Sequence, residues 1–232
     1  MKAIIMAAGR ATRMLPLTKT LPKCLLKIGG KSILQHQIDV LKKCGIKNIV
    51  IITGHNIKKI EDSCGKEFKY ILNPFDSVSG MAMSLWLAKD EFNDNILVIY
   101  SDVLFNEDLI KKLLGCKGDI SLAIDKSSVD MEAEKVKIKN DSIVEISKTS
   151  ISVEKADGEF IGLIKFKKSL KKIVAEELEI LARTNINSYL IDLIRNIINR
   201  DVKVVPCDIT GDVWIDIDFP EDLKKAKELD FV

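Results

Sequence analysis

The sequence predicts an α/β fold of the Rossmann-like, doubly wound class, built on a mixed and mostly parallel sheet with a small antiparallel subregion. Two observations predict it. In the first half of the 232-residue chain, short apolar and β-branched runs alternate with segments of helical periodicity, as parallel β-α-β units require. After about residue 130, single apolar and polar residues alternate, which is typical of antiparallel strands with one solvated face.

The first half is expected to begin with a strand in the apolar run 3–8, which leads into a loop. Ser32 followed by Gln35 is a capping-box pattern, so a helix is expected to begin there and to end near Gly45. Further strands are expected at 49–53, 70–72, 96–100 and 120–124, and further helices at 57–64, 79–91 and 106–114.

The second half is expected to begin with a hairpin. Its alternating segments, 136–138 and 143–146, flank Asn140 and Asp141, which favour a tight turn. Pro220 is typical of a first helical position, so the last helix is expected to begin there. The other elements are strands at 160–166, 202–205 and 213–217 and helices at 168–183 and 187–199. No internal repeat or long linker interrupts the sequence, and we expect one domain over 1–232.

Composition excludes several classes of protein. The 36 basic residues are spread among 34 acidic ones, and a formal net charge of +2 gives no support to a nucleic-acid-binding surface. No apolar run approaches the roughly 18 residues that cross a bilayer, so no membrane insertion is expected. The five dispersed cysteines favour reduced thiols in a cytoplasmic protein. His36 and His55 lie on separate predicted elements, which argues against a histidine-based metal site.

Residues 7–23, AAGRATRMLPLTKTLPK, form the most informative segment. A strand that runs into a basic loop of small residues presents backbone N–H groups and cations to a polyphosphate. Gly9 is expected to turn the chain where a side chain would obstruct a triphosphate. Arg13 suits bidentate contact with phosphate, and Lys23 supplies a point charge. The alternative is an ordinary basic connection between a strand and a helix.

Three carboxylates stand where an open α/β sheet collects ligands. Asp102 follows the predicted strand at 96–100, at its carboxyl end. Asp216 and Asp218 alternate with apolar residues, so both side chains are expected to leave the same face of one strand. This arrangement allows Asp218, helped by Asp216, to share a divalent cation with Asp102. A turn or helix-capping aspartate is the alternative for Asp102.

The spacing G-x-x-x-R-x-x-P-x-T-x-x-x-P-K from Gly9 to Lys23 resembles the signature of the nucleoside-triphosphate transferases, a family that includes sugar-phosphate nucleotidylyltransferases and phosphocholine- and phosphonate-type cytidylyltransferases. The resemblance covers nearly the whole chain and is strongest at 3–30, 95–102 and 213–222. It implies nucleotidyl transfer, in which a phosphate or phosphonate oxygen of an acceptor attacks the α-phosphate of the nucleotide and pyrophosphate leaves. The sequence departs from the family pattern at Ala11, where the family usually has glycine.

The resemblance also implies a role for each group of residues. Arg13 and Lys23 are the expected catalytic charges, and Mg²⁺ is expected to bind Asp102, Asp218 and Asp216. The nucleotide is expected to contact Ala8, Gly9, Arg10, Ala11, Thr12, Asn73, Gly80 and Ser84, and the acceptor Lys148 and Glu159. Tyr189 and Asp192 lie three residues apart on one face of the predicted helix at 187–199, and that spacing adds them to the expected acceptor contacts. For Tyr189 and Asp192 ordinary helix packing is the alternative, and for Lys148 a solvated side chain.

These roles favour a Mg²⁺-dependent cytidylyltransferase that joins CTP to a small phosphorylated alcohol or phosphonate, such as phosphocholine or 2-aminoethylphosphonate. The alternative is a sugar- or polyol-phosphate nucleotidylyltransferase that uses CTP, UTP or GTP, and a third hypothesis is a catalytically inactive nucleotide-binding regulatory subunit. The domain is expected to have a nucleotide-binding half at 1–125 and an acceptor- and metal-binding half at 126–232. The expected partners are the two substrates, and a homodimer is left open.

Overall fold

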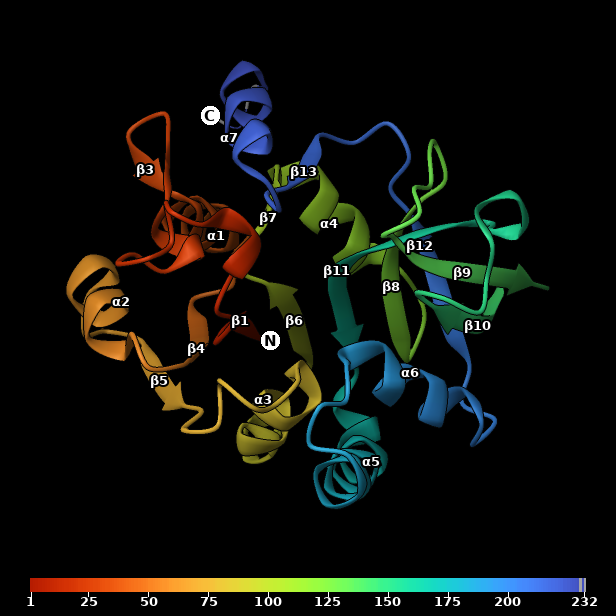
Figure 1. The fold of residues 1–232 in the computed structure, drawn as a ribbon. Coiled ribbons are helices and arrows are strands. Elements are labelled where there is room, and N and C mark those ends of the chain that lie inside the picture. Colours follow the sequence, from red (N-terminus) through yellow and green to blue (C-terminus); the bar gives the residue numbers. More distant parts are fainter. Residues whose placement is uncertain (230, 232) are drawn as a thin grey trace.

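The chain folds around a nine-stranded mixed sheet (Figure 1). The computed structural model describes residues 1–229 and 231. Four parallel strands form one half of the sheet, in the order β6 (Ile96–Tyr100), β1 (Lys2–Ala7), β4 (Asn48–Thr53) and β5 (Lys69–Leu72). Their residues are apolar at nearly every position, as expected for strands that are covered on both faces.

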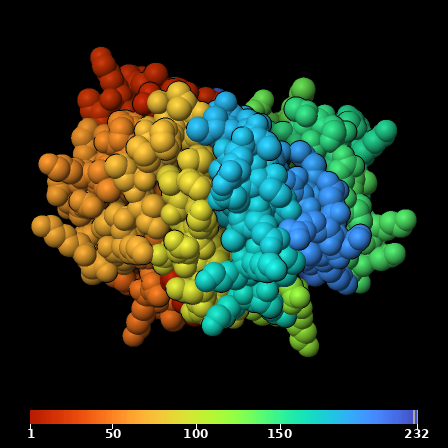
Figure 2. Space-filling view, turned by 90° about the horizontal axis from the view of Figure 1, so that it is seen from below, coloured from red at the N-terminus to blue at the C-terminus, as the bar shows by residue number. Residues whose placement is uncertain are grey.

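Helices cover both faces of this parallel half. Successive residues of a strand point to opposite faces, and the core divides accordingly. Ile4, Val50 and Val98 pack on the side of α3 (Met81–Leu87), α5 (Lys171–Thr184) and α6 (Leu190–Ile198). Their neighbours along the strands pack on the side of α1 (Ile33–Lys43), α2 (Ile57–Cys64) and α4 (Glu107–Gly115). Figure 2 shows the first group of helices lying side by side across one face of the molecule.

The other half of the sheet is mainly antiparallel. Its long strand β11 (Gly158–Phe166) pairs antiparallel with β6, with β8 (Ile120–Asp125) and with β9 (Glu134–Lys139). A hairpin joins β9 to β10 (Ser142–Ser147), and β12 (Val204–Asp208) pairs parallel with β8. At the hairpin turn, Asn140 and Asp141 both have positive φ, as their sequence predicts. The mixed, mostly parallel fold predicted from the sequence is thus confirmed.

A short ribbon of two strands joins the middle of the chain to its C-terminal part. β7 (Val103–Phe105) follows β6 directly and pairs antiparallel with β13 (Trp214–Asp216), which precedes α7 (Pro220–Glu228). A second small ribbon, β2 (Lys27–Ile28) with β3 (Lys31–Ser32), precedes α1. Strands of two or three residues carry too little periodicity to be predicted, and β2, β3 and β7 were not expected from the sequence.

Several predicted boundaries shift in the structure. The helix expected at 79–91 ends at Leu87 and gives way to a 3-10 turn at Lys89–Glu91. The strand expected at 202–205 becomes Val204–Asp208, because its register is set by pairing with β8. At the start of α1, the Ser32 hydroxyl accepts from the Gln35 N–H, but the Gln35 amide donates to Asp39 and leaves the capping box incomplete. No helix among residues 1–229 and 231 is long and apolar enough to cross a membrane.

A buried ion cluster lies beside the start of the sheet. Lys2 is 5% exposed, and its ammonium group contacts Glu91 Oε2 (2.6 Å), while Lys69 contacts Glu91 Oε1 (2.5 Å). Burial alone would raise the pKa of Glu91, but the hydrogen bonds from Lys2 and Lys69 outweigh it and hold that pKa below its usual value. Glu91 therefore stays ionised in the folded protein and balances the buried charge of Lys2.

Replacing Glu91 by Gln should destabilise the fold by about 3 kcal/mol at pH 7, because the Lys2 ammonium group is left buried without a counter-charge. Urea unfolding measures this difference. The contribution of the Glu91 charge is fully present above the unfolded pKa of about 4.3 and is lost as the pH falls through the lower folded pKa, so the difference should shrink in acid. Glu67→Gln, on an exposed side chain, is the control and should change stability by less than about 0.5 kcal/mol. An equal effect of both substitutions at pH 7 would show that the Glu91 charge does not offset the buried charge of Lys2.

Candidate active site

A cavity of about 730 Å³ opens at the carboxyl ends of the parallel strands. The walls come from the loops that follow β1, β5 and β6, from β11 and from the segments around 128–134 and 214–225. All but three of the predicted site residues line it, the exceptions being Arg10, Thr12 and Asp192. The fold therefore brings residues from both ends of the sequence to one place.

The loop after β1 contains a strained residue. Ala11 has φ 48° and ψ 50°, in the left-handed region that glycine adopts readily and alanine does not. Its carbonyl accepts hydrogen bonds from the Thr18 hydroxyl (2.8 Å) and the Met14 N–H (3.1 Å), which hold this conformation. A Cβ atom placed on Gly9 would meet no other atom within 4 Å, so this position is open. The backbone conformation explains why glycine suits position 11.

Three carboxylates converge on one side of the cavity. Asp102 follows β6, and pairing of β7 with β13 sets Asp216 opposite Val103. The strand ends at Asp216, although the next N–H, that of Ile217, still donates to the Asp102 carbonyl (3.0 Å). Asp218 thus lies beyond the strand, contrary to the prediction. One carboxylate oxygen from each of Asp102, Asp216 and Asp218 nevertheless lies within 4.8 Å of the others.

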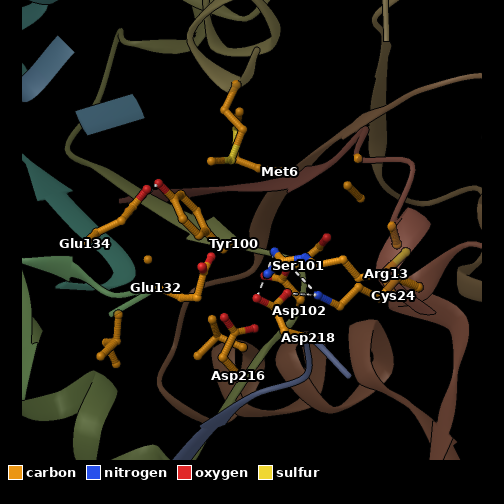
Figure 3. Close-up of a pocket in the computed structure, with 18 of the residues that line it drawn as sticks. Met6, Arg13, Cys24, Tyr100, Ser101, Asp102, Glu132, Glu134, Asp216 and Asp218 are labelled. Atoms are coloured by element: carbon orange, nitrogen blue, oxygen red, sulfur yellow. Dashed lines mark hydrogen bonds and ion pairs between the residues drawn. The ribbon is translucent and has the colours of Figure 1, made fainter. Parts of the chain in front are cut away.

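Two cations of the basic loop neutralise part of this negative charge. Lys23 Nζ contacts Asp102 Oδ2 (2.9 Å) and Asp218 Oδ1 (2.7 Å), and the Arg13 guanidinium contacts Asp218 Oδ2 (2.8 Å) (Figure 3). Burial disfavours the charged form of Lys23, but the nearby carboxylates outweigh this effect and raise its pKa. Lys23 and Arg13 are therefore charged and held directly beside the carboxylates.

Asp216 has no cation of its own. Its Oδ1 atom is shielded from solvent and has no hydrogen-bond partner among the described residues. Burial first, and then the charge of Asp102, raise the pKa of Asp216 well above its usual value. A divalent cation beside Asp216 would satisfy this oxygen and offset the repulsion. Carboxylate oxygens are also the ligands that Mg²⁺ prefers, so Asp102, Asp216 and Asp218 fit such an ion.

The predicted nucleotide-binding side chains after β5 are bonded to one another. The Asn73 amide donates to the hydroxyls of Ser79 (3.0 Å) and Ser84 (2.8 Å), and its oxygen accepts from the Phe75 N–H (2.8 Å). Gly80 packs against the loop before α6, where a Cβ atom would lie 2.2 Å from the Ser188 carbonyl oxygen. These contacts give Asn73, Ser84 and Gly80 a structural role at the edge of the cavity.

The predicted acceptor residues divide into two groups. Lys148, Glu159 and Tyr189 line the cavity. Asp192 points elsewhere, because its carboxylate accepts from the Tyr189 N–H (2.7 Å) and from Arg195 (2.8 Å) at the start of α6. The helix-packing alternative describes Asp192 better than the predicted acceptor contact. Arg10 and Thr12 also lie off the cavity wall: Arg10 pairs with Asp76 at 3.8 Å, and Thr12 begins a 3-10 turn.

Sequence reasoning missed several carboxylates of the cavity. Asp130, Glu132 and Glu134 line it together with Glu159, and Figure 3 shows Glu132 and Glu134 across the cavity from Arg13. Burial, as the largest cause, raises the pKa values of Glu134 and Glu159 to about 7. The alternate spacing of these acids at 130, 132 and 134 repeats the pattern that drew attention to Asp216 and Asp218. That signal was available in the sequence.

Comparison with known proteins assigns this chain to a family. The family model described as the MobA-like NTP transferase domain matches residues 3–129. CTP:phosphoglutamine cytidylyltransferase of Campylobacter jejuni is 28% identical over 97% of this chain and 98% of its own length. Choline-phosphate cytidylyltransferase of Streptococcus pneumoniae is 34% identical over 45% of this chain and 46% of its length. The structure of the inositol-1-phosphate CTP transferase from T. maritima has the same fold, with a TM-score of 0.81, 22% identity and coverage of 98% and 96% of the two chains.

Replacing Ala11 by Gly should stabilise the protein by about 0.5–1 kcal/mol, because it removes the cost of a left-handed alanine and adds only the smaller entropy loss of glycine. Thermal and urea unfolding measure the change. Ala156→Gly is the matched control, since Ala156 has φ −69° and gains nothing from glycine. That control should lose about 0.5–1 kcal/mol. Destabilisation by both substitutions would show that the conformation of Ala11 is not strained.

Proposed function

Because this chain belongs to the family of MobA-like NTP transferase domains, we propose that it is a Mg²⁺-dependent cytidylyltransferase that joins CTP to a small phosphorylated alcohol or phosphonate. One observation carries the proposal: Lys23 and Arg13 lie against Asp102 and Asp218 in a single cavity. The names of the relatives from C. jejuni and S. pneumoniae support CTP as the nucleotide.

The proposed reaction needs charge stabilisation more than proton transfer. The attacking oxygen belongs to a phosphate or phosphonate that is already anionic at neutral pH, so no general base is required. Negative charge builds up around the α-phosphate as pyrophosphate leaves, and Lys23 and Arg13 are the chain's own groups to stabilise it. Asp102, Asp216 and Asp218 would hold Mg²⁺, which supplies further positive charge at the phosphates. The retention of all these residues argues against an inactive regulatory subunit.

The acidic wall of the cavity supports an acceptor with a positive charge. Asp130, Glu132, Glu134 and Glu159 form this wall. Of the lining lysines, Lys23 and Lys225 are paired with aspartates elsewhere in the site, which leaves Lys148. The nearby ammonium group of Lys135 is bound instead to the carbonyl oxygens of Met131 (2.9 Å) and Ala133 (3.0 Å). A zwitterion such as phosphocholine or 2-aminoethylphosphonate would bring its phosphorus group to the cations and its ammonium group to this wall. A polyol or sugar phosphate is the alternative, since carboxylates also accept from hydroxyls.

The first test of the function combines substrates with site variants. Pyrophosphate release is expected from CTP with phosphocholine or 2-aminoethylphosphonate when Mg²⁺ is present. Asp102→Asn and Asp218→Asn should each lower kcat/KM by about 100-fold or more, because each removes a carboxylate that would hold the Mg²⁺ whose charge acts on the reacting phosphates. Both variants should also bind Mn²⁺, used as a spectroscopic probe of the site, more weakly than the wild type. Asp62→Asn, on the exposed surface of α2, is the control and should behave as the wild type does.

The substrate panel decides between the hypotheses. Higher turnover of UTP or GTP with a hexose or inositol phosphate would favour the sugar- or polyol-phosphate alternative. No pyrophosphate from any pair of substrates, with nucleotide still bound, would favour the regulatory subunit. Wild-type activity of either aspartate variant would remove that residue from the proposed metal site.

The acceptor preference should depend on pH. With pKa values of about 7, Glu134 and Glu159 lose their charges as the pH falls from 8 to 6, and the attraction for an ammonium group falls with them. We therefore expect the ratio of kcat/KM for phosphocholine to that for 2-hydroxyethyl phosphate to rise with pH through about 7. The neutral acceptor carries the same phosphate, so this ratio cancels the titration of the phosphate itself.

Variants of Glu134 and Glu159 test whether these two acids cause the pH dependence of the ratio. Glu159→Gln should lower the ratio at pH 8 by about 10-fold, since it removes one carboxylate charge, and opposite unit charges about 4 Å apart attract by about 1–4 kcal/mol. The double variant Glu134→Gln/Glu159→Gln should abolish the pH dependence of the ratio. Glu154→Gln, an exposed acid away from the cavity, serves as the control. A ratio that is independent of pH in the wild type would argue against a cationic acceptor.

A further inference from the structure

Asp76 lines the cavity at the point where the loops after three strands meet. Three neighbouring parallel strands, β1, β4 and β5, end here, and one residue from each following loop meets the others. Asp76 Oδ2 accepts from the ring Nδ1 of His55 (2.5 Å) and from the His55 N–H (3.2 Å), and it lies 3.8 Å from Arg10 Nε. The Asp76 side chain is only 5% exposed, yet it lines the cavity.

The residues around Asp76 leave space for its carboxylate and stabilise its charge. A Cβ atom on Gly54 would lie 2.5 Å from Asp76 Oδ2, so only glycine leaves room for the carboxylate at this point. Burial opposes the charge of Asp76, but hydrogen bonds from His55 and the nearby charge of Arg10 hold its pKa below the usual value. Asp76 is therefore ionised near neutral pH and can only accept hydrogen bonds.

One oxygen of this carboxylate can still accept a hydrogen bond. Oδ2 makes the contacts with His55 and Arg10, and Oδ1 has no hydrogen-bond partner among the described residues. The nearby side chains of Asn73 and Ser84 are bonded to each other (2.8 Å), so they do not replace Asp76 as acceptors. An acceptor that is held rigidly and faces a cavity is a means of selecting a ligand with an N–H donor.

The position of the phosphates decides which part of a nucleotide meets Asp76. On the proposed function, on which this inference rests, the phosphates lie between Lys23, Arg13 and the carboxylates of Asp102 and Asp218. A further carboxylate that shares no cation with Lys23, Arg13 or the proposed metal site would repel the phosphates. At the other end of the same nucleotide, such a carboxylate would instead meet the base. Cytosine presents an exocyclic amine, and uracil presents a carbonyl oxygen at the equivalent position.

We propose that Asp76 is a specificity-determining residue that selects nucleotides whose base carries an exocyclic amine and rejects uracil and thymine. The amine donates to the free oxygen of the carboxylate, while His55 holds the other oxygen in place. With uracil, two acceptors face each other, and the buried carboxylate loses its contact with water without gaining a donor. Selection against UTP and dTTP is thus a property of one side chain.

Nucleotide binding without an acceptor tests the inference separately from catalysis. Titration calorimetry with CTP, UTP, GTP and ATP in Mg²⁺ should show CTP binding to the wild type about 50-fold tighter than UTP. In Asp76→Asn, the amide offers a donor to uracil as well as an acceptor to cytosine, so the two affinities should come within about 5-fold of each other. Asp62→Asn is the control and should keep the wild-type preference.

Two further measurements separate base selection from a structural role of Asp76. His55→Ala leaves the carboxylate but removes its support, so both nucleotides should bind more weakly while CTP remains preferred. The N4,N4-dimethyl analogue of CTP has no exocyclic N–H donor, and it should bind the wild-type protein about as weakly as UTP. This last measurement needs no variant and therefore holds even where Asp76→Asn does not fold.

The outcomes distinguish the inference from the proposed function. Equal affinities of the wild type for CTP and UTP, or tight binding of the dimethyl analogue, overturn the role of Asp76 and leave nucleotidyl transfer intact. An Asp76→Asn variant that folds and keeps the full preference for CTP overturns it too. Failure of all four triphosphates to bind overturns the proposed function and the inference with it.

Discussion

The pairing of β7 with β13 is the interaction on which the candidate site depends. It is a ribbon of three residues on each side, and it holds the segment after Thr210 against the end of β6. This contact brings Asp216 and Asp218 to Asp102, more than a hundred residues earlier in the chain. The N-cap of α7 adds to the constraint, because Asp222 Oδ2 accepts from the N–H groups of Asp218 (3.1 Å) and Phe219 (2.8 Å). The carboxylates are therefore held in place by the backbone before any cation arrives.

The two sides of the cavity differ in their charge. At the phosphate end, Lys23 and Arg13 are bound to carboxylates, and the cluster is nearly balanced. At the opposite wall, the lysine nearest in sequence, Lys135, donates to backbone carbonyls of its own loop, and the charge of Lys148 only partly offsets the effect of burial on Glu134. Burial of these acids raises the pKa values of Glu134 and Glu159, which is the response of a carboxyl group that lacks a counter-ion. On the proposed function, a cavity charged in this way would suit a ligand with a negative and a positive end.

The sequence was sufficient for the elements with strong local signals and insufficient for contacts made over long distances. The buried strands β1, β4 and β6 and the capped helices α1 and α4 were predicted because apolar runs and N-cap residues are local. The strand at 213–217 that contains β13 was predicted too, but its partner β7 and their pairing were not, since β7 is too short to show periodicity and the pairing joins segments far apart in the sequence. Asp192 was assigned to the acceptor because its spacing from Tyr189 fits a shared helical face; only the structure reveals its bonds at the start of α6. Asp76 has no sequence signal, because its partners Arg10 and His55 follow two other strands, β1 and β4.

The attachment of the acidic wall to the sheet affects how such proteins can change during evolution. The acids at 130–134 lie in and beside the loop between β8 and β9, and this loop is held by the buried Lys135, which also belongs to the sheet. The pairings of β8 and β9 with β11 form a scaffold that does not involve the tip of the loop. Changes in the length or charge of the tip therefore leave the phosphate end untouched. On the proposed function, acceptor preference and the chemistry of transfer would be separable traits, and exchange of this loop between relatives would offer a route to new nucleotide-activated products.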